Sequence, residues 1–449
     1  MFDKILIANR GEIATRIIRA AHELGVKTVI VYSETDKDTL PVKLSDEAVC
    51  IGPAPSAQSY LVVPNIIGAA QITGAQAIHP GYGFLAENAD FARACAENDI
   101  VFIGPSPECI ERMGDKAHAR ETMESFGVPC VPGSDGVVES VEEAAKFADE
   151  VGYPVLIKAS AGGGGKGMRV CEKPQDLEAM FQAAKTEAQN AFGNGDVYLE
   201  KYLARPRHVE MQVLADNFGN AMHLCERDCS IQRRHQKLLE EAPSPALSEE
   251  TRQKMGEVAI KAVKAVDYKN AGTIEFLLDT DGSFYFMEMN TRVQVEHPVS
   301  EQITGSDIIK EQLRIAANEP ISIADKAPLS PIAHAIEFRI NAEDPDNNFC
   351  PCPGKITRFD LPGGPGVRVD THIRAGAFVP PTYDSLIAKL IVWGDTREEA
   401  IARGKRALDE FVVEGIATTI PFHKKVLDNE AFNKGIVYTD FIETEMAEA

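Results

Sequence analysis

The sequence predicts a protein of several domains that combines α/β and α+β architecture. Its 449 residues exceed the length of one ordinary domain, and an apolar share of 44% supplies ample core material. Strand-like and helix-like runs alternate up to about residue 115, which favours a parallel sheet. Residues 331–395 carry strand patterns separated by Pro-Gly turns, so we expect the last domain to be rich in strands, followed by a helix at roughly 397–411 and a strand-like close.

The chain opens with a strand, a turn and a helix. Residues 4–8 read Lys-Ile-Leu-Ile-Ala, and Ile13 and Ile17 begin the apolar stripe of a helix. Residues 27–32 form the next strand, and this βαβ order predicts parallel pairing. Because Gly11 is the single glycine of the turn, the Gly-x-Gly-x-x-Gly dinucleotide fingerprint is absent. We therefore expect a Rossmann-like domain without that cofactor.

Residues 128–136 are the clearest break in the chain. Two prolines and two glycines within these nine residues predict a hinge or linker. A small α+β unit follows, then longer strands and helices up to about residue 325. We expect five parts: an N-terminal domain at 1–115, a linker helix at 116–130, a small lid domain at 131–203, a central domain at 204–330 and a C-terminal domain at 331–449.

A glycine-rich loop lies between two short strands of the predicted lid. A buried strand at 155–158 leads into four consecutive glycines, and Met-Arg-Val from residue 168 reads as the returning strand. Glycines let backbone N–H groups close on phosphate oxygens. Lys166 is followed by glycine instead of Ser or Thr, which excludes a Walker A loop and favours a flexible phosphate cover, with an ordinary flexible loop as the alternative. The expected phosphate contacts are Gly163, Gly164, Gly165 and, as the fixed cation, Lys158.

A hairpin with two acidic side chains follows in the central domain. Residues 272–278 and 283–290 are strand-like and are joined by an Asp-Thr-Asp-Gly turn. Period-two alternation puts Glu275, Glu288 and Asn290 on one face. Two carboxylates and an amide suit Mg²⁺, which takes one or two carboxylates together with phosphate oxygens. The alternative is two solvent-facing acids on an edge strand, which the apolar run around them disfavours.

An arginine and a further acid come directly after this hairpin. Arg292 can clamp a planar anion with two hydrogen bonds, and Glu296 can serve as a general base. A metal site, a cationic clamp and a base together predict phosphoryl transfer to a small oxyanion. Residues 226–237 add a local group of cations in a chain whose net charge is −22, with a solvated charged face as the alternative. That net charge argues against nucleic acid as the main partner.

The cysteines and the hydropathy indicate a reduced, soluble environment. Nine cysteines are scattered without a Cys-x-x-Cys pair, and no apolar run reaches the length of a membrane span. The N-terminus enters a strand without the basic start and apolar stretch of a signal peptide. Cys225 and Cys229, followed by His235, could suggest zinc, but a fourth ligand and a tight second pair are missing. We expect a cytoplasmic protein with no membrane span.

Nearly the whole chain resembles a known family. The glycine-rich flap, the acidic hairpin and Arg292-Val-Gln-Val-Glu296 are similar to the ATP-grasp superfamily and, more narrowly, to biotin carboxylase, the subunit of bacterial acetyl-CoA carboxylase. Several motifs in order carry the resemblance: Ile7-Ala-Asn-Arg-Gly-Glu-Ile-Ala, His79-Pro-Gly-Tyr-Gly-Phe-Leu, Met113-Gly-Asp-Lys116, Arg233-Arg-His-Gln-Lys237, Arg339-Ile-Asn-Ala-Glu-Asp and Tyr383-Asp-Ser. The resemblance implies a Rossmann-like N-terminal domain, an ATP-grasp lid and central domain, and a strand-rich C-terminal domain.

The resemblance also implies a role for each matching position. ATP would be held at its phosphates by Lys116 and Lys158, at its adenine by Glu200, Lys201 and Leu203, at its ribose by His208, and along the rest of the site by Gln232 and His235. Mg²⁺ or Mn²⁺, with two ions expected, would be bound by Glu275, Glu288 and Asn290. Bicarbonate would be bound by Lys237, Arg292 and the backbone N–H groups of Gln294 and Val295, and deprotonated by Glu296. Biotin would meet Arg339, with Tyr82 and Asp384 nearby.

The implied reaction is ATP- and bicarbonate-dependent carboxylation of biotin through carboxyphosphate. Carboxyphosphate would break down to CO₂ and phosphate, the phosphate would take the N1 proton of biotin, and the enolate would capture CO₂. The product would feed a carboxyltransferase that makes malonyl-CoA for fatty acid synthesis. The chain has no Met-Lys-Met biotin attachment site and no carboxyltransferase region, so we expect a separate biotin carboxyl carrier protein and separate carboxyltransferase subunits as partners.

Other readings stay open at this point. The chain could be the equivalent subunit of a pyruvate or propionyl-CoA carboxylase, another ATP-grasp ligase, or a nucleotide-binding subunit without turnover. Two departures from the family pattern are Lys166 where an arginine is frequent, and cysteines at 350 and 352, the second where a serine is usual. Family members dimerise through the first and last domains. Arg19, Glu23 and Arg368 match the contact positions, although Pro365 stands where an aromatic can occur, and we expect a homodimer.

Overall fold

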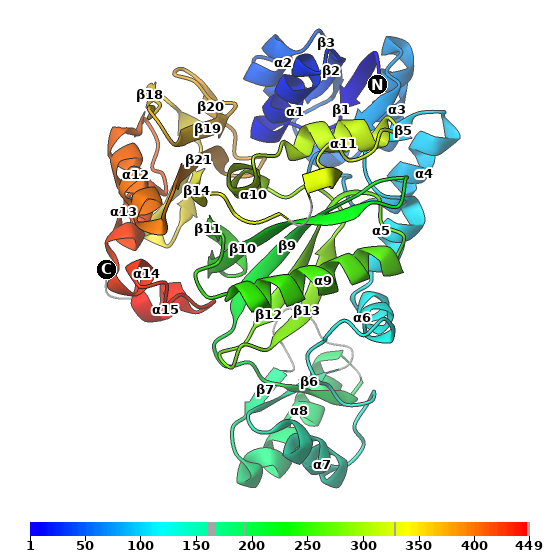
Figure 1. The fold of residues 1–449 in the computed structure, drawn as a ribbon, viewed down its shortest axis with the longest axis vertical. Coiled ribbons are helices and arrows are strands. Elements are labelled where there is room, and N and C mark those ends of the chain that lie inside the picture. The colour runs from blue at the N-terminus through cyan, green and yellow to red at the C-terminus, as the bar shows by residue number, and fades with distance from the viewer. Residues whose placement is uncertain (160–167, 193, 327–328, 447–449) are drawn as a thin grey trace. The chain divides into compact units, whose positions relative to one another are not determined.

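The computed structural model describes residues 1–159, 168–192, 194–326 and 329–446 (Figure 1). The chain divides into two compact units. Unit 1 comprises Met1–Val128, Arg207–Phe276 and Glu288–Ala449, and unit 2 comprises Pro129–Pro206 and Leu277–Met287. The predicted domain boundaries stay a prediction. Within the described residues, no helix is both long and apolar enough to cross a membrane.

The N-terminal part of unit 1 contains a five-stranded parallel sheet. Its strand order is β3-β2-β1-β4-β5. The chain adds β2 and β3 on one side of β1 and then returns to add β4 and β5 on the other side. This confirms the predicted βαβ start and parallel sheet. The elements are β1 (Lys4–Ile7), α1 (Gly11–Glu23), β2 (Lys27–Ser33), α2 (Leu40–Leu44), β3 (Glu47–Gly52), α3 (Val63–Thr73), β4 (Ala77–His79), α4 (Ala89–Glu97), β5 (Val101–Phe102), α5 (Pro107–Gly114) and α6 (Lys116–Ser125).

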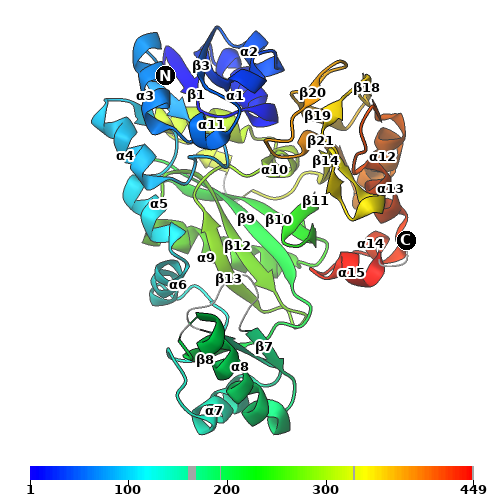
Figure 2. The ribbon, with the colours of Figure 1, turned by 180° about the vertical axis from the view of Figure 1, so that it is seen from behind.

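An eight-stranded sheet joins the central and C-terminal parts of the chain. Its order is β13-β12-β9-β10-β11-β14-β21-β19. The junction is the antiparallel pairing of β11 with β14, in which Leu239 lies opposite Phe338. The strands are β9 (Arg207–Ala215), β10 (Ala221–Arg233), β11 (Gln236–Ala242), β12 (Asn270–Leu278), β13 (Phe284–Asn290), β14 (His334–Asn341), β19 (Val367–Thr371) and β21 (Leu386–Gly394) (Figure 2). The hairpin predicted around the acidic residues is therefore present as β12 and β13.

Helices cover this sheet at the positions that matter for the site. Helix α9 (Glu249–Ala265) packs on β9 and β10, as Figure 1 shows. Helix α10 (His297–Thr304) contacts β10, β11, β14 and β21, and it begins directly after Glu296. Pro298 in its first turn favours a helix start at this residue. Helix α11 (Ile308–Ala316) packs against α1.

The C-terminal part confirms the strand-rich prediction and corrects one detail. Helix α12 (Arg397–Glu410) packs on β21 and β14, close to the predicted bounds. The strand-like close predicted after it is wrong beyond β22 (Val412–Glu414), because three helices follow. In α13 the buried residues Phe422, Val426 and Leu427 recur at the spacing of one helix face, which favours a helix. The three helices are α13 (Ile420–Asp428), α14 (Glu430–Asn433) and α15 (Phe441–Glu445).

Unit 2 is a small α+β body. Its antiparallel sheet has the order β7-β6-β8, and Lys158 at the end of β6 lies opposite Met168 at the start of β7. The strand pair on both sides of the glycine-rich loop is therefore confirmed. The loop at 160–167, which includes Gly163, Gly164, Gly165 and Lys166, lies outside the described residues. The elements are α7 (Val141–Val151), β6 (Val155–Ala159), β7 (Met168–Cys171), α8 (Leu177–Phe192) and β8 (Val197–Lys201).

Candidate active site

The floor of the candidate site is a polar stripe on strand β9. Every residue of β9 is buried, yet His208, Glu210 and Gln212 alternate along it on one face. Since β12 and β10 lie on either side of β9 in the sheet, their polar side chains can meet this stripe. Buried polar groups are costly unless they find partners, so a stripe of three on one buried strand indicates a network.

Arg227 of β10 ties this stripe to α10 and to the loop before it. The guanidinium is fully buried, and each of its five N–H groups is used. The five acceptors are Glu210 Oε1 at 2.6 Å, Gln212 Oε1 at 2.7 Å, Gln294 Oε1 at 2.7 Å, Ser300 Oγ at 3.0 Å and Thr273 Oγ1 at 3.2 Å. A side chain held in this way has one position, and it fixes Gln294 in the loop before α10.

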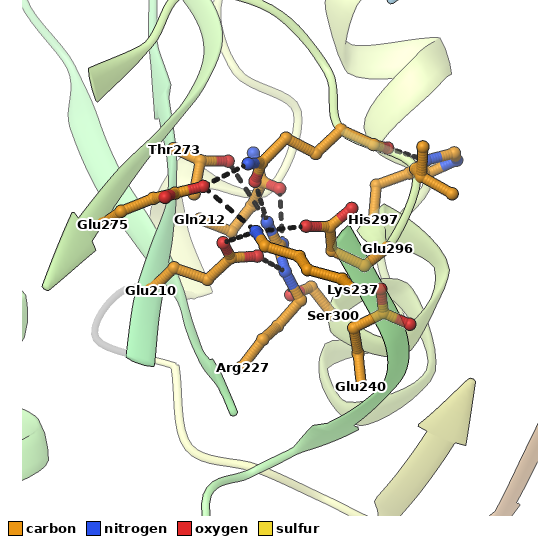
Figure 3. A network of polar contacts seen from close by, with 12 residues as sticks. Glu210, Gln212, Arg227, Lys237, Glu240, Thr273, Glu275, Glu296, His297 and Ser300 are labelled. Atoms are coloured by element: carbon orange, nitrogen blue, oxygen red, sulfur yellow. Dashed lines mark hydrogen bonds and ion pairs between the residues drawn. The ribbon is translucent and has the colours of Figure 1, made fainter. Parts of the chain in front are cut away.

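Lys237 of β11 lies at the centre of three carboxylates (Figure 3). Its Nζ is 2.7 Å from Glu210 Oε2, 3.0 Å from Glu275 Oε1 and 2.7 Å from Glu296 Oε1. Burial would lower the pKa of Lys237, but the surrounding acidic groups outweigh it and hold its pKa well above the ordinary value. Lys237 is therefore a permanent cation that meets carboxylates from two strands, β9 and β12, and from the loop before α10.

Glu296 is the last residue before α10 and is almost fully buried. Its second oxygen accepts a hydrogen bond of 3.0 Å from Arg339 Nη2. Burial would raise the pKa of this carboxyl group, but the neighbouring cations, led by Lys237 and Arg339, keep its pKa well below the ordinary value. Glu296 is accordingly an ionised carboxylate between two cations.

Arg339 of β14 is oriented by a second acid that the sequence analysis did not single out. Its Nε donates to Glu240 Oε1 at 2.7 Å, and its backbone carbonyl accepts from Thr419 Oγ1 at 2.7 Å. Glu240 Oε2 has no hydrogen-bond partner among the described residues. Burial raises the pKa of Glu240 to about 7, and the Arg339 cation counters only part of that rise.

Glu275 gathers donors from both sides of the hairpin. Besides Lys237, its Oε1 accepts from the amides of Asn290 at 2.9 Å and Gln294 at 2.8 Å, and its Oε2 lies 2.9 Å from His208 Nε2. Glu275 is buried on β12, while Glu288 is half-buried on β13. The structure thus brings two of the predicted oxygen ligands, Glu275 and Asn290, into direct contact, and the third lies two residues before Asn290 on the same strand.

Arg292 turns toward the N-terminal domain. Its Nε is 2.8 Å from Glu87 Oε2, and its Nη2 donates to Asn290 Oδ1 at 2.8 Å. Glu87 also accepts from the backbone N–H of Thr291 at 3.0 Å. The predicted anion clamp is therefore anchored to the end of β13.

The hairpin between β10 and β11 carries the predicted nucleotide contacts of the basic run. Its two turn residues, Arg234 and His235, both have positive φ, of 50° and 64°. Two-residue turns of this kind match the twist of paired strands. Gln232 lies directly opposite Lys237 across the hairpin, and His235 is exposed at its tip.

Tyr82 and Asp384, the predicted neighbours of biotin, line one cavity. Its volume is about 380 Å³, and Phe84, Tyr383 and the start of α1 complete its walls. The Tyr82 hydroxyl donates to Glu12 Oε1 at 2.5 Å. Burial, with Glu12 beside it, raises the pKa of Tyr82 well above its ordinary value, so the phenol stays protonated.

Unit 2 carries a second set of predicted nucleotide contacts. Lys158 Nζ forms an ion pair with Glu200 of β8. Lys201 Nζ lies 3.2 Å from Asp279 Oδ2, and Leu203 is buried just beyond β8. Lys116 begins helix α6 of unit 1, and its side chain lies outside the described residues.

Five residues of the site did not stand out in the sequence: Glu210, Arg227, Glu240, Glu87 and Glu12. The signal for Glu210 was present in the alternation His208-x-Glu210-x-Gln212, since a strand buried on both faces has no reason to carry three polar residues in register. Glu240 gave no such signal, because its neighbour is also a glutamate and the pair reads as solvated surface.

Three family models match successive parts of the chain. Residues 1–110 match "Biotin carboxylase, N-terminal domain", residues 115–324 match "Carbamoyl-phosphate synthase L chain, ATP binding domain", and residues 337–444 match "Biotin carboxylase C-terminal domain". The biotin carboxylase of Nostoc sp. is 58% identical over 443 residues, which cover 98% of this chain and 99% of that protein.

Relatives with other names are nearly as similar. A pyruvate carboxylase subunit from Methanothermobacter thermautotrophicus is 54% identical, and the match covers 99% of this chain and 90% of that protein. A solved structure of the biotin carboxylase domain dimer of Hydrogenobacter thermophilus 2-oxoglutarate carboxylase, in complex with MgADP, ADP and bicarbonate, has a TM-score of 0.86 at 51% identity. The match covers 99% of this chain and 97% of that one.

Proposed function

Because the chain belongs to the biotin carboxylase family of ATP-dependent ligases, we propose that it carboxylates biotin borne on a separate carrier protein, in the first half-reaction of an acetyl-CoA carboxylase. In this proposal, ATP and bicarbonate form carboxyphosphate, and CO₂ released from it is captured by biotin. One observation carries the proposal: the ionised Glu296 lies between Lys237 and Arg339, at the start of α10.

Glu296 would accept the proton of bicarbonate. With Lys237 and Arg339 both on it, this carboxylate is a weak base, because the two cations hold its pKa down. An anion that draws these cations to itself would release Glu296 and raise its pKa. The base would then become effective at the moment when its substrate is bound, which is the condition for general-base catalysis. Arg292 and the N–H groups of Gln294 and Val295, near the positive end of α10, would hold the anion.

The oxygen ligands of the hairpin fit a hard divalent cation. Glu275, Glu288 and Asn290 offer carboxylate and amide oxygens, which Mg²⁺ and Mn²⁺ prefer. Lys237 supplies the positive charge that Glu275 requires in this structure, and His208 Nε2 lies 2.9 Å from its other carboxylate oxygen. Bound Mg²⁺, for which we propose two ions, would neutralise charge on the phosphates of ATP. Lys116, Lys158, the flap glycines Gly163, Gly164 and Gly165, and Glu200, Lys201, Leu203, His208, Gln232 and His235 are proposed as its nucleotide contacts.

Arg339 would stabilise biotin as its oxygen gains negative charge. A guanidinium that is already held by Glu240 and Glu296 needs little reorganisation to meet an enolate, which is the condition for electrostatic stabilisation. Tyr82 and Asp384 line the adjacent cavity, and its volume of about 380 Å³ suits a small ligand. A cavity of this size that both predicted neighbours of biotin line supports biotin as the second substrate.

The partners follow from the reaction. We propose a biotin carboxyl carrier protein, carboxyltransferase subunits and a homodimer, and a cytoplasmic location in keeping with nine cysteines scattered without a Cys-x-x-Cys pair. Malonyl-CoA for fatty acid synthesis would be the final product. Pyruvate or propionyl-CoA as the final acceptor is the second candidate, because a relative of 54% identity is named for pyruvate carboxylase.

The decisive experiment measures ADP release by the purified protein with ATP, Mg²⁺ and bicarbonate, with and without free biotin. We expect ADP release to require bicarbonate and to rise with biotin. If another carboxylic acid replaced bicarbonate with faster turnover, the chain would be a different ATP-grasp ligase. Arg339→Ala should abolish the stimulation by biotin while nucleotide binding, measured by calorimetry, survives. The final acceptor is then identified by pairing the enzyme with carrier and carboxyltransferase subunits and testing acetyl-CoA against pyruvate and propionyl-CoA.

A further inference from the structure

A buried lysine on β21 has no place in the chemistry described so far. Lys389 is fully buried and is the one charged residue in a strand that reads Leu-Ile-Ala-Lys-Leu-Ile-Val-Trp-Gly. An apolar side chain would fill this position at lower cost, since a buried ammonium group needs partners to compensate for lost hydration. Its partners should therefore explain why it is there.

Those partners lie on two sides of the candidate site. Lys389 Nζ donates to the backbone carbonyl of Val295 at 2.6 Å and lies 3.2 Å from Glu12 Oε1. The same oxygen of Glu12 accepts the hydrogen bond from the Tyr82 hydroxyl. A continuous chain of contacts thus runs from Tyr82 through Glu12 and Lys389 to the peptide that joins Val295 to Glu296.

The sheet register strengthens this assignment. Lys389 lies directly opposite Arg339 on β14 and opposite Asp370 on β19. Directly opposite residues of paired strands project from the same face of the sheet. Lys389 is therefore the neighbour of Arg339 on one face of the sheet. From this face Arg339 contacts the Glu296 side chain, and Lys389 contacts the backbone of the preceding residue, Val295.

We propose that Glu12 and Lys389 are positioning residues, which link the Tyr82 hydroxyl to the Val295–Glu296 peptide. They would thereby fix the position of the biotin side of the site relative to the bicarbonate side. The inference rests on the proposed function for the roles of Tyr82 and Glu296. In this account Lys389 touches no substrate, and Glu12, in the wall of the cavity, acts through the Tyr82 hydroxyl. Fixing the carbonyl of Val295 fixes the peptide plane from which the Glu296 side chain starts, and small shifts of a base cost catalysis.

Hydrogen exchange measured by mass spectrometry tests the link without any need for turnover. The variants are Lys389→Met and the volume-conserving Glu12→Gln, and the readout is the segment 291–297. We expect exchange there to accelerate on the order of tenfold in Lys389→Met and by a smaller factor in Glu12→Gln, with α9 unchanged. Arg397→Met is the matched control, because it removes the cation of another buried pair, with Glu241 on β11, that lies outside this chain of contacts. Equal acceleration at 291–297 in the control, or none in both test variants, would overturn the proposal.

Kinetics then test the meaning of the link. The bicarbonate KM should rise about fivefold in Lys389→Met, and the biotin KM should rise in Glu12→Gln, whereas a loss of folded enzyme alone would lower kcat without moving either KM. Double-mutant cycles combine Tyr82→Phe with Lys389→Met or with Glu12→Gln. In each cycle the double variant should lose less biotin-dependent rate, by about fivefold, than the product of the two single losses. Losses that multiply would refute the coupling. A wild-type protein without biotin-stimulated ADP release would instead refute the proposed function, and the exchange data would still decide whether the link exists.

Discussion

Two buried groups of charges hold helix α10, and they differ in the direction in which the pKa values of their acids are shifted. The first, called here the Lys237 cluster, contains Lys237, Arg227, Arg339, Glu210, Glu240, Glu275 and Glu296. The second, called here the Glu301 cluster, contains Glu301, Arg16, Arg368, Asp307 and Asp370. Both are in unit 1, and both tie the same helix to its neighbours.

In the Glu301 cluster the charges are paired closely. Glu301 accepts from Arg16 at 2.9 Å, from Arg368 at 2.7 Å and from the backbone N–H of Ile308 at 2.8 Å. Burial would raise the pKa of Glu301, but the two arginines lower it to about 2. Asp370 on β19 is likewise held ionised by Arg368. Every acid of this group that shifts is pushed toward the charged form, as in an ordinary structural ion-pair network.

In the Lys237 cluster neighbouring acids are pushed in opposite directions. The pKa of Glu296 is well below its ordinary value, whereas burial raises that of Glu240 to about 7, although Arg339 contacts both. Glu337, two residues before Arg339 on β14, also has a pKa that burial raises. Acids of divergent strength around one cation are typical of catalytic sites. Burial of charge is common to both groups, and divergent pKa shifts distinguish the Lys237 cluster, which is the one proposed to be catalytic.

The largest expected effect comes from replacing Glu296, the proposed general base of the Lys237 cluster. Glu296→Gln should lower bicarbonate-dependent ADP release by about 10²- to 10⁴-fold, because the amide cannot accept a proton. Nucleotide affinity should change less than threefold, since Glu296 is assigned to bicarbonate. Steady-state kinetics and calorimetric titration of ATP measure the two. A variant with near wild-type turnover would remove Glu296 from the chemistry and leave its ion pairs a structural role.

The corresponding change in the Glu301 cluster should affect stability instead. Glu301→Gln leaves Arg16 and Arg368 short of a compensating charge, which should cost about 4 kcal/mol of folding free energy. Urea unfolding measures the loss. The KM values of the folded fraction should stay within twofold of wild type. A selective rise in the bicarbonate KM would show that the Glu301 cluster also positions Glu296. The two clusters would then no longer differ in their role.

Local sequence patterns predicted several elements of the fold, but they did not predict the long-range contacts of these two clusters. The βαβ start, the acidic hairpin and the strands around the glycine-rich loop follow from local patterns, and the structure has them. The meeting of Lys237 with Glu296 does not, since 59 residues separate them and the packing of α10 against β10, β11 and β14 brings them together. Resemblance to a family supplied that pairing, and pattern alone could not.

Glu240 shows a second limit. It stands beside Glu241 in the sequence, and both are buried on opposite faces of one strand. Glu241 is matched by Arg397 and His334, whereas Glu240 faces Arg339 with one oxygen unpartnered among the described residues. Two adjacent glutamates read as surface in a sequence, because their burial depends on strand pairings that are non-local.

The pH dependence of Glu240→Gln sharpens the comparison. The folded pKa of Glu240 is raised from 4.5 to about 7, so its contribution to stability is fully present below pH 4.5 and is lost as pH rises through 7. Glutamine does not ionise. The variant should match wild type near pH 5 and exceed its folding free energy by about 3 kcal/mol at pH 8. Biotin-dependent turnover should nevertheless fall, because Arg339 loses a charged partner.

Urea midpoints at pH 5, 6, 7 and 8 measure this difference, and assays at pH 8 measure the turnover. Opposite changes in stability and activity are expected of a residue retained for function at a cost to stability. Glu301→Gln should give a constant difference over the same pH range, since the pKa of Glu301 lies near 2. A pH-independent difference for Glu240→Gln would mean that Glu240 is ionised throughout, as in the Glu301 cluster.

The smallest expected effect on folding comes at the exposed margin of the Glu301 cluster. Glu23 Oε2 lies 2.6 Å from Lys310 Nζ, but the Glu23 side chain is 64% exposed. Exposed pairs contribute little, so Glu23→Gln should cost roughly 0.5 kcal/mol or less of folding free energy. The proposed homodimer predicts a different outcome for association, since Glu23 matches a contact position of the family. Sedimentation equilibrium should then show weaker dimerisation in Glu23→Gln than in Glu319→Gln, a control at another exposed ion pair. Equal dimerisation in the two variants would leave Glu23 as a surface residue and remove its proposed part in the dimer.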